Sequence, residues 1–401
     1  MSVTPPRKTE HTRDAKHHDH QFDRRHLLNT HFEAEFLHLL QRVKPRAGHS
    51  PRVDRQVNEP SATLMKDWGE EPTVGQDREM DLSGKTILLT GGTGSFGVAF
   101  IERVIHDWPD ATIRVYSRDE LKQSEVHARF GKENLRFLIG DVRDSVRLAR
   151  AAHGADVIVH AAAMKQVPAC EYNPFEAVQT NVLGAQHVVD AAIDAGVPKV
   201  VALSTDKAVN PVNLYGATKL CEEKIIVQGN AYAAQSNTRL SCVRYGNVVG
   251  SRGSVVPLFR RQALEGRLTV TDERMTRFWI TLPRAVDLVL FALEAMVGGE
   301  VFIPKIPSTR VVDMAEAIAP GVPVDVIGIR PGEKLHEILL TSDEARHSID
   351  AGSVYVVLPE HPWWTAHPRW VEGTPLDLDF NYLSDTNSWW LDADALRALL
   401  A

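Results

Sequence analysis

The sequence predicts an α/β fold, a Rossmann-type doubly wound parallel sheet with a smaller C-terminal substrate-binding part. From residue 85, short apolar segments rich in Val, Ile and Leu alternate with helical stretches. That alternation is typical of buried parallel strands joined by right-handed helical crossovers. A glycine-rich turn follows the first apolar segment, and a Tyr and a Lys four positions apart begin a later helical stretch.

The expected elements follow from these periodicities. The strands are expected at 86–90, 112–116, 135–139, 157–160, 199–203 and 239–243. The intervening helices are expected near 95–107, 119–130, 144–152, 174–195 and 213–230. Beyond residue 250 the pattern is mixed, with helices expected near 283–296 and 311–319 and short strands near 301–303 and 324–328.

Three regions follow from this pattern. Residues 1–80 are polar and His-rich, and we expect a largely disordered extension with one possible amphipathic helix at 26–43. Residues 81–250 are expected to form an NADP-binding Rossmann domain. Residues 251–401 are expected to form the mixed substrate-binding part and a C-terminal tail.

Composition narrows the function. The chain has 401 residues, 43% hydrophobic and 24% charged, which is typical of globular proteins. A net charge of -7 argues against a nucleic-acid partner. The absence of a long apolar run argues against membrane insertion, and no secretory leader is recognised. Three cysteines without disulfide or zinc spacing indicate no metal site and a reducing, cytoplasmic setting.

The turn TGGTGSFG at 90–97 follows the first expected strand and opens the first expected helix. Gly91 permits the tight turn, Gly94 lets the backbone approach a pyrophosphate, and Gly97 lets the helix pack on the strand. The helix N-terminus then faces the phosphates. The predicted dinucleotide-binding residues of this turn are Thr90, Gly91, Gly94, Ser95, Phe96 and Gly97.

The end of the second strand should contact the adenosine ribose, where a basic residue favours a 2′-phosphate. Ser117 and Arg118 stand there, with Lys122 one turn further on, so the sequence favours NADP. Asp119 and Glu120 lie close enough to keep NAD as the less favoured alternative. Other expected cofactor contacts end the third and fourth strands: Asp141, Val142, Ala161, Ala162 and Ala163.

Tyr215 and Lys219 lie on one face of their expected helix. The ammonium can lower the phenol's pKa and so produce a base for a hydroxyl proton near neutral pH. Asp206 and Lys207 add a second acid/base pair upstream. An alcohol dehydrogenase does not need that second pair, whereas an enzyme that also breaks a C–H and a C–O bond does.

With these motifs the chain resembles the extended short-chain dehydrogenase/reductases. More narrowly, it resembles the inverting UDP-N-acetylglucosamine 4,6-dehydratases among the polysaccharide-biosynthesis proteins. The resemblance covers roughly residues 84–400 and rests on segments 90–97, 117–122, 165–168, 180–181, 204–219, 244–257, 275–279 and 330–337. The first 80 residues have no counterpart in it.

The resemblance implies an NADP-dependent hydro-lyase that acts on a UDP-sugar as a homo-oligomer. Tyr215 would take the O4 proton, and Lys219 would lower the tyrosine's pKa and hold the nicotinamide ribose. Lys207 would remove the C5 proton, Asp206 would protonate the departing C6 hydroxyl, and Thr205 would hydrogen-bond near O4. Such a lysine base must be partly neutral, which burial beside another cation would achieve.

The resemblance also implies residues that bind the UDP-sugar. Basic side chains suit its diphosphate, since arginine can grip phosphate oxygens in a fork. The expected substrate-binding residues are Lys165, Asn181, Asn247, Arg252, Arg277, Lys305, Arg330 and Glu333. Three alternatives stay open: a UDP-sugar 4-epimerase, a retaining 4,6-dehydratase on the same fold, and a non-catalytic NADP-binding protein.

Overall fold

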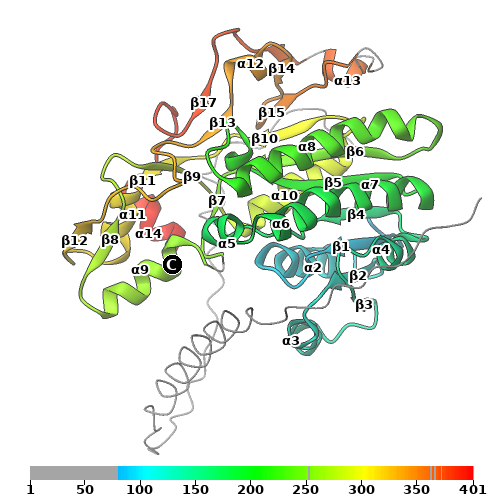
Figure 1. Ribbon diagram of the computed structural model, residues 1–401, viewed down its shortest axis with the longest axis horizontal. Coiled ribbons are helices and arrows are strands. Elements are labelled where there is room, and N and C mark those ends of the chain that lie inside the picture. The colour runs from blue at the N-terminus through cyan, green and yellow to red at the C-terminus, as the bar shows by residue number, and fades with distance from the viewer. Residues whose placement is uncertain (1–79, 252, 362–363, 365–366, 372, 401) are drawn as a thin grey trace, which may run out of the picture. The chain divides into compact units, whose positions relative to one another are not determined.

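The computed structural model describes residues 80–251, 253–361, 364, 367–371 and 373–400 (Figure 1). The expected extension over 1–80, with its possible helix at 26–43, therefore lies outside the described residues except for Met80.

Ten strands of the described residues form one sheet (Figure 1). Its seven-stranded core is parallel, and the last three strands pair antiparallel. All six expected strands lie in the parallel core, which confirms the doubly wound fold. In spatial order the strands are β3 (Leu135–Ile139), β2 (Thr112–Ser117), β1 (Thr86–Thr90), β4 (Val157–His160), β5 (Lys199–Thr205), β6 (Arg239–Tyr245), β10 (Val301–Pro304), β15 (Val354–Val357), β14 (Ser348–Asp350) and β16 (Thr374–Pro375).

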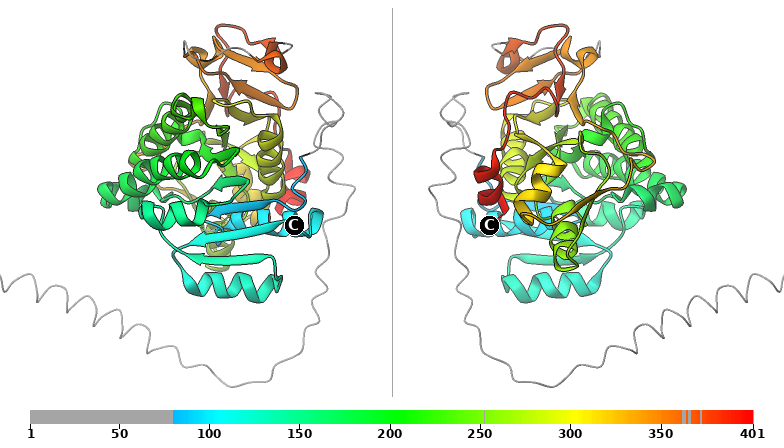
Figure 2. Two further views of the ribbon diagram at one scale, coloured as in Figure 1. Left: turned by 90° about the vertical axis from the view of Figure 1, so that its right-hand side faces the viewer. Right: turned by 90° about the vertical axis from the view of Figure 1, so that its left-hand side faces the viewer.

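Helices cover both faces of the sheet, as Figure 2 shows. Helices α4 (Ser145–Ala152), α7 (Gly184–Ala195) and α8 (Leu214–Tyr232) pack together on one face. Helices α2 (Ser95–Asp107) and α10 (Leu282–Ala295) pack together on the other, and α3 (Glu120–Phe130) packs beside β2 and β3. In α2, Gly97, Phe100, Ile101 and Val104 are buried. This is the i, i+3, i+4, i+7 spacing of one helix face, so the sequence period explains which side meets the sheet.

The single helix expected at 174–195 is instead divided. It consists of α6 (Pro174–Ala177), a π-helical turn (Val178–Leu183) and α7, preceded by α5 (Val167–Tyr172). The Asn181 side chain in the π turn bonds the backbone N and O of Met164 at 2.8 and 2.9 Å. The wider π turn therefore places the Asn181 side chain against the backbone of Met164, outside the helix. Helical periodicity in the sequence does not reveal such a contact.

A smaller group of elements follows β6 and lies beside the parallel sheet (Figure 1). Strands β11, β9 and β7 form one small sheet, β12 and β8 a second, and β13 and β17 a third. The elements of this group are β7 (Asn247–Val248), α9 (Val255–Leu264), β8 (Leu268–Val270), β9 (Thr276–Ile280), β11 (Ser308–Arg310), α11 (Val311–Ile318), β12 (Val324–Val326), β13 (Ile338–Leu340), β17 (Tyr382–Leu383) and α14 (Ala393–Leu400).

Part of the chain after residue 250 belongs to the main sheet rather than to this group. Strand β10 pairs with β6, and α10 packs on α2, β5 and β6. Strands β14, β15 and β16 extend the same sheet, with α12 (Ser342–Ala345) and α13 (Pro368–Val371) beside them in the sequence. The main sheet therefore continues past residue 250, where the sequence predicted a domain boundary. The apolar runs of α10 and β10 predict burial, but they do not indicate which sheet these segments join.

Candidate active site

The glycine turn packs tightly against the end of β4. Gly91 has φ +67, and a Cβ there would lie 2.8 Å from the Ala161 backbone. A Cβ on Gly97 would lie 2.5 Å from the Gly92 backbone. Both positions therefore require glycine for close backbone approach. Gly94 caps α2 without a side-chain bond, and Ser95, Phe96 and Gly97 at the start of α2 line the cavity described below.

Thr90 has a different position from its predicted one. It is fully buried and does not line the cavity described below. Its Oγ1 lies 2.7 Å from Nδ1 of His160 and accepts hydrogen bonds from the backbone of Ala161 and Ala162 at 3.2 and 3.3 Å. Burial, with Lys219 nearby, lowers the pKa of His160 to about 3, so this ring is neutral. Thr90 thus supports the cavity wall from behind.

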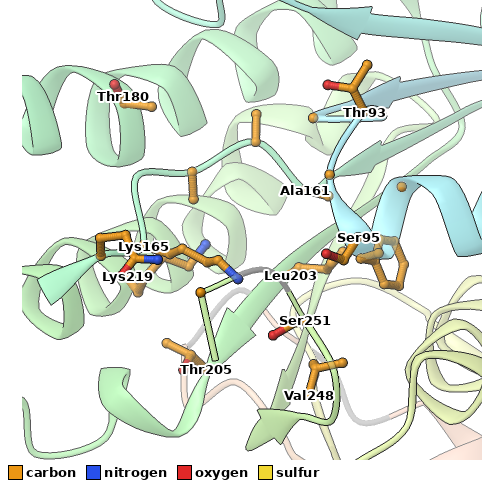
Figure 3. A pocket seen from close by; sticks show the side chains of 18 of the residues that line it. Thr93, Ser95, Ala161, Lys165, Thr180, Leu203, Thr205, Lys219, Val248 and Ser251 are labelled. Carbon is orange, nitrogen blue, oxygen red and sulfur yellow. The ribbon is translucent and has the colours of Figure 1, made fainter. Parts of the chain in front are cut away.

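A cavity of about 680 Å³ runs from the glycine turn past the ends of β4 and β5 to β7 (Figure 3). Ser95 and Ala161 lie on one side of it, and Lys165 and Lys219 on the other, as Figure 3 shows. Most of the residues predicted from the sequence line this cavity: Gly91, Gly94, Ser95, Phe96, Gly97, Ser117, Arg118, Lys122, Asp141, Val142, Ala161, Ala162, Ala163, Lys165, Thr205, Lys207, Tyr215, Lys219 and Asn247.

The end of the cavity beside β2 is basic, but its cations have partners. Arg118 Nη1 lies 3.6 Å from Asp141 Oδ2, and Lys122 Nζ lies 2.7 Å from Asp119. Arg143 also binds Asp141, at 2.7 Å. Burial acts to raise the pKa of Asp141, but Arg143 and Arg118 outweigh it and lower that pKa. The Arg118 side chain is 60% exposed, so it is free to turn toward a ligand.

Tyr215 and Lys219 both line the cavity from the first turns of α8. Lys219 is 3% exposed, and its Nζ bonds Glu222 Oε2 at 2.5 Å. Burial, followed by Glu222 and Asp206, raises the pKa of Tyr215, opposite to the lowering that the sequence predicted. Burial is the largest cause, and the ammonium of Lys219 binds Glu222 one turn along its own helix. Sequence reasoning missed Glu222, although an acidic residue three positions after Lys219 was a visible signal.

The second pair lies in the turn Asp206–Ala208 that directly follows β5. Asp206 is fully buried behind the cavity wall, and its Oδ1 accepts hydrogen bonds from Thr205 Oγ1 at 2.8 Å and Lys207 Nζ at 3.0 Å. Burial raises the pKa of Asp206 and outweighs the opposing effect of Lys207. A raised pKa is the direction that a proton donor requires, but the Asp206 side chain does not line the cavity, contrary to the prediction.

Lys207 lines the cavity, but its environment is not the one expected. Its Nζ lies 3.3 Å from Asn247 Oδ1 and 3.3 Å from Glu337 Oε1. Burial lowers the pKa of Lys207, yet Asp206 and Glu337 raise it by more. The expectation of a partly neutral lysine is therefore wrong for this state, since carboxylates rather than cations are its nearest neighbours. Glu337 was also missed, because only the folded chain brings it beside Lys207.

The two pairs are held at a fixed spacing by a close backbone contact. Asn213 caps α8 by accepting a hydrogen bond from Gly216 N at 2.8 Å. A Cβ on Gly216 would lie only 2.0 Å from the carbonyl oxygen of Lys207. The first turn of α8 therefore rests directly on the turn that carries Asp206 and Lys207.

Several predicted substrate residues lie away from the cavity. Asn181 is fully buried and bonds Met164 and Thr218, so it is occupied by the fold. Arg277 is buried and donates to the carbonyls of Thr276, Lys334 and Leu335. Neither side chain is free to hold a diphosphate.

The remaining basic candidates are likewise not brought to the cavity. Lys305 binds Asp350 at 2.8 Å and lies over the Tyr355 ring. Arg330 and Glu333 form a loose pair at 4.0 Å on the surface of their loop and do not line the cavity. Arg252 lies outside the described residues. The sequence predicted these basic residues as phosphate ligands from their positive charge. In the folded chain, Lys305 and Arg330 lie beside acidic side chains instead.

No helix among the described residues combines the length and apolar character needed to cross a membrane. Within the same residues, no group of three or more His, Cys, Asp or Glu side chains is arranged to hold a metal ion.

The doubly wound sheet, the glycine turn and the Tyr215–Lys219 pair define an extended short-chain dehydrogenase/reductase. The chain belongs to the polysaccharide biosynthesis protein family, which matches residues 87–359. It is similar to the UDP-N-acetylglucosamine 4,6-dehydratase (inverting) of Campylobacter jejuni strain 81-176, with 48% identity over 79% of this chain and 98% of the relative.

Two further comparisons support the same grouping. The UDP-glucose 4-epimerase of Rickettsia canadensis is 44% identical over 68% of this chain and 82% of its own length. Among solved structures, Pen from Bacillus thuringiensis superposes with a TM-score of 0.74 and 38% identity, covering 80% of this chain and 98% of Pen.

Proposed function

We propose that the protein is a UDP-N-acetylglucosamine 4,6-dehydratase that inverts C5, giving UDP-2-acetamido-2,6-dideoxy-β-L-arabino-hex-4-ulose for glycan precursor synthesis. One observation carries the proposal. The pair Asp206–Lys207 and the pair Tyr215–Lys219 are held against each other at one cavity. The 48% identity to an inverting dehydratase supports the same reaction.

The cavity fits a nicotinamide dinucleotide. Glycine is required at positions 91 and 97, and the start of α2 opens toward the same space. Such a cofactor supplies reversible hydride acceptance at C4 and hydride donation at C6. We propose NADP rather than NAD because Arg118 and Lys122 line the ribose end of the cavity. Replacing Arg118 by Ala should weaken NADP binding by about tenfold and leave NAD binding nearly unchanged, as measured by fluorescence titration.

Tyr215 takes the O4 proton as C4 is oxidised, with Thr205 beside the same hydroxyl. Lys219, which binds Glu222 in the structure, would hold the nicotinamide ribose and stabilise the tyrosinate. The new 4-ketone acidifies C5, and Lys207 removes the C5 proton. Asp206, whose pKa is raised by burial, gives its proton to the leaving C6 hydroxyl, which departs as water. This step requires the turn at 206–208 to shift toward the bound sugar, because Asp206 does not line the cavity.

On the substrate side, Lys165 and Asn247 line the cavity near Lys207 and are proposed to contact the sugar nucleotide. Burial, with Lys207 nearby, lowers the pKa of Lys165, and the negative charge of an incoming diphosphate would raise it again. Arg330 and Glu333 enter this proposal only if their loop moves toward bound UDP.

A 4-epimerase is the main alternative, supported by the 44% identity to the Rickettsia canadensis enzyme. An epimerase has no use for a proton donor and a base at C5 and C6, so Asp206 and Lys207 favour the dehydratase. A retaining 4,6-dehydratase would differ in the face on which C5 is reprotonated. A non-catalytic NADP-binding protein would have no need of Tyr215 at the cavity.

The experiment is incubation of the pure protein with UDP-N-acetylglucosamine and NADP, followed by NMR of C4, C5 and C6. A 4-keto-6-deoxy product with inverted C5 is expected. A 4-epimer, a retained C5 configuration or an intact C6 hydroxyl would each reject the inverting assignment. A cytoplasmic location and a homo-oligomer belong to the same proposal, the latter to be checked by light scattering of the full chain.

A further inference from the structure

Lys207 is held between two carboxylates that come from distant parts of the chain. Its Nζ lies 3.0 Å from Asp206 Oδ1, which belongs to the same turn, and 3.3 Å from Glu337 Oε1, which lies just before β13. Asn247 Oδ1 on β7 is a third acceptor at 3.3 Å. The ammonium therefore has an acceptor on each side and a fixed direction at the cavity wall.

Glu337 is itself fixed and buried. It is 2% exposed, and its backbone N donates to Ser384 Oγ at 2.9 Å. Arg277 Nε lies 3.6 Å from Oε1, and Lys334 Nζ lies 4.0 Å from Oε2. Oε2 has no hydrogen-bond partner within the described part of the chain. Glu337 does not line the cavity, so it acts on substrate only through Lys207.

Charged groups of both signs face this lysine, and the start of α8, which packs on the same turn, adds the Tyr215 phenol. The cations are Arg277 on β9, Lys334 in the loop before β13 and Lys165 after β4, and the anions are Asp206 and Glu337. Burial raises the pKa of Asp206, which favours its uncharged form. Burial also acts to raise the pKa of Glu337, but Lys207, Arg277 and Lys334 outweigh it and keep that carboxylate ionised. Glu337 is thus a buried carboxylate that stabilises the Lys207 ammonium from outside the turn that carries it.

We infer that Glu337 is a positioning residue that orients Lys207 and keeps it an ammonium until the substrate enters, and so sets the pH range of the elimination. The inference rests on the proposed function. Before the C5–H bond breaks, one N–H bond of Lys207 must break and its proton must pass to water. The free electron pair on Nζ then takes the C5 proton, and the C–H electrons enter the enolate of the 4-ketone.

The test is Glu337→Gln, which keeps the side-chain shape and removes the charge. The readout is the rate at which C5 of the substrate exchanges with deuterium from D2O, followed against pH. Removing a carboxylate from an ammonium lowers its pKa. The acid limb of the exchange profile should therefore move down by at least about one pH unit, which is about a tenfold faster exchange at a fixed pH on that limb.

Glu337→Asp keeps the charge and shortens the side chain, so its limb should stay near the wild-type position even if the rate falls. Glu316→Gln, an exposed carboxylate on α11, is the matched control and should change neither rate nor limb. If Glu337→Gln lowers the rate at every pH without moving the limb, Glu337 is only structural and the inference is wrong.

Two further checks keep the outcomes separate. If Glu337→Gln does not fold, NMR titration of labelled lysines in the wild-type protein decides: Lys207 must titrate above the free-lysine value of about 10.4. A titration below that value overturns the inference. If the wild-type protein forms no dehydrated product at all, the proposed function fails, and that result is distinct from an unmoved limb in an active enzyme.

Discussion

Gly216 offers a direct perturbation of the contact between the two acid/base pairs. In Gly216→Ala the new methyl group would lie 2.0 Å from the Lys207 carbonyl oxygen and 2.9 Å from its carbonyl carbon. Ordinary contact begins at 3.4 Å, so the start of α8 and the turn at 206–208 must separate by about 1.4 Å, the difference between 3.4 and 2.0 Å. Backbone cannot relax as easily as the end of a side chain, so the spacing between Tyr215 and Lys207 changes.

The expected effect is large on turnover and moderate on stability. A displacement of about 1 Å can cost about 100-fold in rate when reacting groups must be aligned. Overpacking costs about 1–3 kcal/mol, offset by about 1 kcal/mol from replacing a helical glycine by alanine. Product formation should therefore fall by about 100-fold or more, while the free energy of unfolding falls by no more than about 2 kcal/mol.

The assay is product formation followed by NMR, with denaturant unfolding and cofactor titration on the same sample. Gly229→Ala is the matched control, because it lies on the same helix but its new methyl group would meet the Val189 side chain, at 2.9 Å, which can shift. The control should keep near-normal turnover. Turnover of Gly216→Ala within about threefold of wild type would refute the reasoning that this contact fixes the active geometry.

Three further predictions concern stability and cofactor binding. Arg244→Met removes the partner of Glu223 at 2.7 Å and Glu344 at 2.8 Å and leaves the buried Glu223 carboxylate unpaired, so denaturant unfolding should show a loss of about 3–5 kcal/mol. Burial raises the pKa of Glu222 from 4.5 to about 7, so its contribution to stability is complete below pH 4.5 and is lost as pH rises to 7. That loss amounts to about 3 kcal/mol. The wild-type free energy of unfolding should therefore be higher at pH 5 than at pH 8, and Glu222→Gln should remove this contribution to the difference. An unchanged difference in the variant would contradict the buried position of this carboxyl. Gly97→Ala should weaken dinucleotide binding by at least about tenfold in fluorescence titration, since its Cβ would lie 2.5 Å from Gly92 backbone, and unchanged binding would argue against the turn as the pyrophosphate site.

The parts of the fold that were predictable are those encoded by local patterns. Parallel strands buried on both faces leave short apolar runs, and these placed six strands of the sheet correctly. Strand β10 and helix α10 were also predicted as elements, but the sequence placed them in the smaller C-terminal part, whereas they belong to the main sheet and the helices that cover it. An apolar run shows that a segment is buried, and it does not show which neighbouring sheet buries it.

The site shows the same division. Residues 91–97 and the pair at 215 and 219 were found because their spacing along the chain is itself the signal. Glu337 reaches Lys207 through a contact between the loop before β13 and the turn after β5, so no local spacing reveals it. The charges of Lys305 and Arg330 suggested phosphate binding, but side chains of the fold satisfy them instead.

The most direct measurement of the central claim compares the wild-type protein with Lys207→Ala during incubation with UDP-N-acetylglucosamine. The wild-type product should carry a 4-ketone, a C6 methyl group and inverted C5 by NMR. Lys207→Ala should still bind NADP and oxidise C4, but it should exchange no C5 hydrogen and release no water. Full formation of the dehydrated product by Lys207→Ala would contradict the joint action of the two pairs on one sugar ring.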